Sequence, residues 1–229
     1  MGIGEKITPI LVGVAALVAA GHIVIGVYSV ADINWMHFKV TGNSTNLREY
    51  KTRTRGLTLE CVDNEEDSCQ ALERHDAKSR HSDRVRSVLD LRSASFGLPL
   101  ASASFTGLIF LLGAIIYIVF RRKPRYRQVL LLIMGICNWI SGLVSFVGLI
   151  TYLESQNQEA HKYDPTLITA RATWTELSLR SATVSDCTLE PTARTATTEY
   201  FGYAFILSVV SCILCHVATF VLFTASLWA

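Results

Sequence analysis

The chain has 229 residues, of which half are apolar and only 17% are charged, and its formal net charge is +2. The charged residues avoid four long windows entirely, which excludes an ordinary water-soluble domain. The small net charge, with no basic run on an exposed domain, also excludes the electrostatic footprint of a nucleic-acid-binding protein.

Four windows contain no Lys, Arg, Asp or Glu, and they hold 25, 28, 26 and 30 residues: 7–31, 93–120, 128–153 and 200–229. About 20 apolar residues suffice to cross the hydrocarbon core. We therefore predict an integral membrane protein with four transmembrane helices. A cleaved signal peptide is the alternative for the first window, but that window is longer than a usual apolar signal region and only Lys6 precedes it.

The segment between the second and third windows predicts the orientation. Five cations lie within residues 121–127, namely Arg121, Arg122, Lys123, Arg125 and Arg127. A short basic loop stays on the cytoplasmic side, so we expect both termini in the cytoplasm of a plasma-membrane protein. The successive segments are then the N-terminus with the first span (1–31), a first extracellular loop (32–92), the second span (93–120), a basic cytoplasmic loop (121–127), the third span (128–153), a second extracellular loop (154–199) and the fourth span (200–229).

Three cysteines fall on the expected outer side, where disulfides persist: Cys61, Cys69 and Cys187. Cys61 and Cys69 bracket a polar stretch short enough for a hairpin turn, so they are the preferred pair. Cys187 is then free, capped, or joined to a partner chain. Asn43 begins a glycosylation sequon on the same side, and we expect it to be used.

The first outer loop has the patterns of a small folded domain. Residues 35–40 and 56–62 alternate and are rich in strand formers, and each predicts a strand. Val85, Val88 and Leu89 recur near helical spacing, which predicts a short helix leading into the second span. In the second outer loop, residues 172–179 predict one more strand.

Three sequence features are Trp35 after the first span, the pair Gly56-Leu57, and the cysteines Cys61 and Cys69. Together they resemble the signature of the claudin superfamily. That superfamily includes claudins, peripheral myelin protein, clarins and the γ subunits of voltage-gated calcium channels. Thr58 departs from it, because the family usually has a second aromatic residue there. Residues 140–152 and 199–205 resemble the γ-subunit branch. The resemblance implies a left-handed four-helix transmembrane bundle with a small extracellular antiparallel β-sheet, built mostly from the first outer loop with one strand from the second.

Two histidines and one asparagine lie well inside the predicted spans: His22, His216 and Asn138. Residues 212–216 match the C-x-x-C-H pattern for haem attachment, but they lie in mid-span rather than in an accessible loop. His22 and His216 as haem ligands from facing helices are a second reading. We favour a structural contact between Asn138 and His216, which lie at similar depths, about 16 and 20 Å from the inner ends of their spans. We expect no cofactor and no metal.

The sequence contains no H-E-x-x-H, G-x-S-x-G or phosphate-loop motif, so we predict a non-enzymatic protein. The favoured function is an auxiliary or regulatory subunit of an ion channel or receptor, acting through its transmembrane faces and its extracellular sheet. The alternatives are a claudin-type cell-junction or adhesion protein and, more weakly, a membrane-organising protein of the myelin type. The expected partners are membrane lipid and another integral membrane protein or a second copy. Because the chain ends at Ala229 directly after the last window, we expect no scaffold-binding tail.

Overall fold

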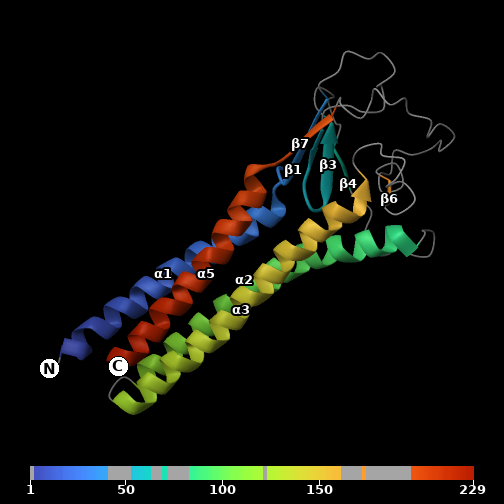
Figure 1. The fold of residues 1–229 in the computed structure, drawn as a ribbon. Helices are drawn as coiled ribbons and strands as arrows, with labels where there is room; N and C mark the ends of the chain where they lie inside the picture. The colour runs from blue at the N-terminus through green and yellow to red at the C-terminus, as the bar shows by residue number, and fades with distance from the viewer. Residues whose placement is uncertain are drawn as a thin grey trace. The chain divides into compact units, whose positions relative to one another are not determined.

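The computed structural model describes residues 3–40, 53–62, 69–71, 83–120, 123–160, 172–173 and 197–229. Within these ranges, four helices are long and apolar enough to cross a membrane (Figure 1). They are α1 (Ile3–Ala31), α2 (Asp83–Val119), α3 (Pro124–Gln158) and α5 (Tyr203–Trp228). The prediction of four long apolar helices is confirmed.

The helices extend beyond the uncharged windows. The short helix expected near Val85 and the second span form one continuous helix, because α2 begins at Asp83. Helix α3 begins at Pro124, so Arg125 and Arg127 lie in its first turn rather than in a loop. A proline is well suited to the first helical position, since its missing N–H has no helical partner there. The absence of charged residues identifies the apolar part of a helix, but it does not show where the helix ends.

Five strands form one small sheet in the order β4-β3-β2-β1-β7, and every neighbouring pair is antiparallel. They are β1 (Met36–Val40), β2 (Arg53–Arg55), β3 (Leu59–Val62), β4 (Gln70–Ala71) and β7 (Thr197–Phe201). The strand predicted at 35–40 is β1. Within the segment predicted at 56–62, β3 occupies the second half.

The strand that the second outer loop contributes to this sheet differs from the predicted one. Ala172–Thr173 forms β6, which pairs in parallel with β5 (Glu159–Ala160) outside the five-stranded sheet. The strand beside β1 is β7, which only Gly202 separates from α5. Gly202 N donates to the carbonyl oxygen of Trp35 over 2.9 Å, which continues the ladder past the last strand residue. Its direct connection to α5 therefore places β7, and not the more distant segment, against β1.

The chain divides into two compact units. The first, here called the bundle unit, comprises Met1–Ser29, Gly97–Gly148 and Leu207–Ala229; the second, the sheet unit, comprises Val30–Phe96 and Leu149–Ile206. The core of the bundle unit includes Ala15, Leu131, Met134 and Leu222, which are buried. In the sheet unit, the five strands lie with the adjoining ends of the four helices.

Gly56 occupies a position in the sheet unit where the main chain approaches itself closely. A β-carbon on Gly56 would lie 2.7 Å from the carbonyl oxygen of Asp32 and 2.8 Å from the Cα of Ile33. Both are backbone atoms, so neither can move aside as the end of a side chain would. This contact gives the Gly56-Leu57 pair a packing role, and Leu57 is itself buried.

We expect Gly56→Ala to lower the stability of the sheet unit by roughly 1–3 kcal/mol, because the added methyl group overpacks a backbone contact. The measurement is the thermal midpoint of the purified full chain in mild detergent. Gly13→Ala is the matched control, since nothing lies within 4 Å of a β-carbon at Gly13. Equal midpoints for the two variants would contradict the packing role.

Candidate functional site

Eight polar side chains from all four helices meet inside the bundle unit. We call them the polar network: His22, Ser102, Thr106, Asn138, Ser141, Ser211, Cys215 and Thr219, every one of them buried. They join α1, α2, α3 and α5 through side-chain hydrogen bonds. A polar side chain in an apolar helix bundle is satisfied when it faces inward and finds a partner, and all eight do so.

His22 joins three helices. Its Nδ1 lies 2.9 Å from the carbonyl oxygen of Ser211 on α5, and its Nε2 lies 3.3 Å from Ser102 Oγ on α2. The carbonyl oxygen can only accept, so this arrangement favours the proton on Nδ1. The Ser211 hydroxyl in turn donates to the carbonyl oxygen of His22 over 2.8 Å. Both ring nitrogens are therefore engaged within the bundle unit.

Asn138 makes the second junction. Its Nδ2 donates to the carbonyl oxygen of Cys215 and to Thr219 Oγ1, each over 2.9 Å, and its Oδ1 accepts from Thr106 Oγ1 over 3.2 Å. Both amide hydrogens are used. Ser141 links the two junctions, because its hydroxyl lies 2.8 Å from Thr106 Oγ1 and 3.0 Å from Ser102 Oγ.

The hydrogen bond that we expected between Asn138 and His216 is replaced by these contacts. His216 bonds within its own helix, with Nδ1 2.9 Å from the carbonyl oxygen of Cys212. Its ring lies against Gly142 of α3, where a β-carbon would come within 2.7 Å of the His216 Cε1. Consecutive helix residues point about 100° apart, and Cys215 rather than His216 faces Asn138.

Sequence reasoning missed the hydroxyl members of the network: Ser102, Thr106, Ser141, Ser211 and Thr219. Serine and threonine are common in apolar helices because their hydroxyls can bond to a carbonyl of their own helix, as Thr219 does with Cys215 over 3.1 Å. Their presence alone therefore carries little signal. The usable signal was their recurrence near the levels of His22 and Asn138.

We expect Asn138→Leu to lower the free energy of unfolding by about 1–3 kcal/mol, since it removes up to three interhelical hydrogen bonds of modest strength. Titration with a denaturing detergent, followed by circular dichroism, measures this change. Ile140→Leu, a similar-sized change at an exposed position of α3, should leave the unfolding curve in place. Identical curves for Asn138→Leu and wild type would rule out a structural role for the amide.

Trp35 is the centre of the sheet unit and is fully buried. Its ring meets Tyr152 of α3 edge-on, with ring centroids 4.7 Å apart, and Phe205 of α5 at 6.0 Å. Its main-chain N–H donates to the carbonyl oxygen of Arg55 over 3.1 Å. Trp35 thus fastens the start of β1 to two helix ends, while Thr58, where a second aromatic residue was expected from the resemblance, is only partly buried.

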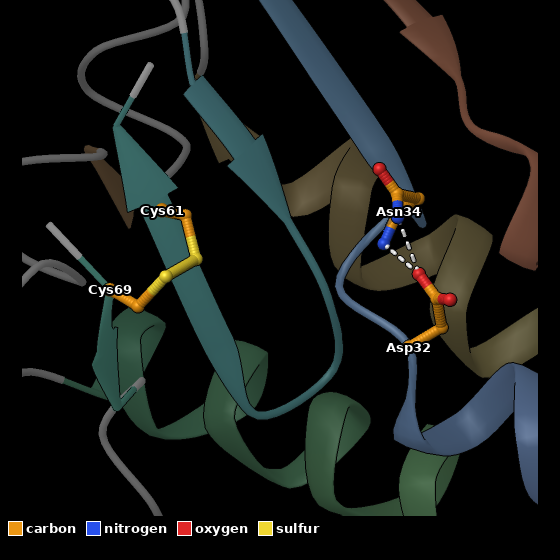
Figure 2. The surroundings of a disulfide bond; sticks show 4 residues. All are labelled: Asp32, Asn34, Cys61 and Cys69. Carbon is orange, nitrogen blue, oxygen red and sulfur yellow. Dashed lines mark hydrogen bonds between the residues drawn. A yellow bond between two sulfur atoms is a disulfide. The ribbon is translucent and has the colours of Figure 1, made fainter. Parts of the chain in front are cut away.

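Two further links hold the same unit together (Figure 2). The predicted disulfide joins Cys61 of β3 to Cys69, directly before β4. Closing a loop of this length contributes about 2–3 kcal/mol through the entropy of the unfolded chain. After α1, the Asp32 carboxylate accepts from the Asn34 main-chain N–H over 2.7 Å. It also accepts from the Tyr203 hydroxyl over 2.6 Å, which ties the exit of α1 to the start of α5.

One face of α3 in the bundle unit points away from the other helices. We call it the α3 outer face, and it carries five large apolar side chains that are all exposed: Leu132, Ile136, Trp139, Leu143 and Phe146. Their alternating spacing of four and three residues is that of a helix–helix seam. The indole N–H of Trp139 has no hydrogen-bond partner among the residues that the structure describes.

The remaining predicted positions divide into two groups. Lys123, Arg125 and Arg127 lie at the turn between α2 and α3 and in the first turn of α3. Asn43, Cys187, Arg121 and Arg122 lie outside the described residues. Within the described ranges, no three His, Cys, Asp or Glu side chains gather closely enough to hold a metal ion.

Comparison with protein-family models and with curated protein sequences finds no match for this chain.

Proposed function

We propose that this chain is a four-pass, claudin-like protein of the plasma membrane, with both termini cytoplasmic, that serves as an auxiliary subunit of an ion channel or receptor. The four apolar helices support the membrane assignment. The five cations within residues 121–127 support the orientation. The polar network supports a non-catalytic role, because its members bond to one another rather than line a site for a substrate.

The proposal of an auxiliary role depends on the position and exposure of Trp139. It lies near the middle of the 33-residue apolar stretch Pro124–Gln156, about 23 Å along the helix from Pro124. Its side chain is 47% exposed on the α3 outer face. Tryptophan normally lies at the membrane–water interface, where its N–H reaches water or a headgroup. At mid-span there is no water, so an outward-facing N–H without a partner is unfavourable unless another protein supplies an acceptor.

The chemistry of this face favours a different protein over a second copy. The five side chains of the α3 outer face include no hydrogen-bond acceptor, since an indole is a donor only. Pairing two α3 outer faces would therefore leave both indole groups unsatisfied. A partner helix that carries Ser, Thr, Asn or Gln at the bilayer midplane supplies what is missing.

The test is a gentle-detergent purification of the tagged full chain from its native cells, with co-purifying proteins identified and quantified by mass spectrometry. We expect a stoichiometric channel or receptor subunit. Trp139→Phe should reduce its recovery about three- to twentyfold, as expected for one lost intramembrane hydrogen bond.

Trp228→Phe is the matched control, because Trp228 is equally exposed, at 48%, but ends α5 instead of lying at mid-span. It should leave recovery unchanged. Recovery only of the chain itself, or of copies on apposed membranes, would overturn the auxiliary role in favour of adhesion. An equal loss from both tryptophan variants would remove the special role of Trp139.

A further inference from the structure

The bundle unit carries its charge very unevenly. It contains six cationic side chains and one carboxylate, Glu5, and five of the cations fall within residues 121–127. The first turn of α3 contains no acidic residue. The amino end of a helix carries a partial positive charge, so the cations at this helix start reinforce it instead of offsetting it. Acidic side chains of the bundle unit therefore do not balance the cations at this helix start.

The described residues on either side of the chain reversal between α2 and α3 contact one another. The Lys123 main-chain N–H donates to the carbonyl oxygen of Phe120 over 2.9 Å. The rings of Phe120 and Tyr126 stack with centroids 5.3 Å apart, and the Lys123 Nζ lies 5.5 Å from the centre of the Tyr126 ring. Lys123, Arg125 and Tyr126 are all exposed.

Arg127 adds an observation that is independent of the exposed charges. Its side chain is only 9% exposed, and its Nη2 donates to the main-chain oxygen of Ala229 over 2.6 Å. Its Nε is buried and has no hydrogen-bond partner in the part of the chain that the structure describes. A buried guanidinium with an unused donor, one turn from the start of α3, is incompletely satisfied by the residues that the structure describes.

We propose that the start of α3 binds the phosphate of an anionic phospholipid in the leaflet that it faces, with Lys123, Arg125 and Arg127 as the cationic side chains of the site. The exposed Tyr126 ring stacked on Phe120 suits the headgroup level, where amphipathic aromatic rings lie. Anionic lipids are concentrated in the cytoplasmic leaflet and attract juxtamembrane cations. The site is separate from the α3 outer face and stands whether or not the chain is an auxiliary subunit.

The test is a titration of the purified full chain in mild detergent, read by native mass spectrometry, with phosphatidylserine and phosphatidylcholine of identical acyl chains as probes. We expect phosphatidylserine to bind at least tenfold more tightly. Arg125→Gln and Lys123→Gln should each weaken phosphatidylserine binding about fivefold, the effect of one cation near an anionic lipid surface, and leave phosphatidylcholine binding unchanged.

Lys6→Gln is the matched control, because it also removes one exposed cation from the bundle unit but belongs to α1. It should change phosphatidylserine binding less than twofold. Thermal midpoints identify any variant that fails to fold, and the two turn variants test the site separately. Equal affinity for the two lipids, or an equal loss from Lys6→Gln, would overturn the proposal. Free phosphoserine at the same concentrations should not compete, and competition would show that a soluble anion is the ligand.

Discussion

A polar side chain buried among apolar helices has no water to bond, so its partner must come from another part of the protein. The polar network meets this constraint with side chains from α1, α2, α3 and α5 that satisfy one another. Apolar packing alone would leave each helix free to rotate or slide, because lipid tails are as apolar as leucine. His22 and Asn138 remove that freedom, since a hydrogen bond forms only at one rotation and one depth. The surfaces that remain outside, including the α3 outer face, are defined by the same rotations.

The number and approximate places of the apolar helices could be predicted because charge is so costly in lipid that its absence marks a span. The helix ends could not, since charged residues do not end a helix, as α2 shows by beginning at Asp83. The sheet illustrates the same division. Alternation identified β1 and part of β3, whereas the choice of β7 over Ala172–Thr173 depended on how Gly202 and α5 follow it.

A site residue could be recognised in the sequence when its residue type is rare in the surrounding segment. Asn138 and His22 stand out in apolar windows, and two cysteines eight residues apart suggest their own bridge. The partner of Asn138 could not be identified in this way, because Cys215 and His216 are consecutive in the helix and point in directions about 100° apart. Trp139 could have been noticed in the sequence, because it is an amphipathic ring far from either end of its apolar stretch. Its use as evidence for a partner depended on the structure, which shows that it faces outward on α3.

The position of β7 has a consequence for the order in which the protein is assembled. Strand β1 pairs on one side with β2, which is close in sequence, but on the other side with β7, where Met36 stands opposite Phe201. During synthesis the β1–β4 part of the sheet can form early, while the free edge of β1 waits until most of the chain has left the ribosome. An unpaired edge is a site for wrong strand pairing, and non-local pairings form slowly. The sheet can therefore be completed only after β7 has been made, directly before α5.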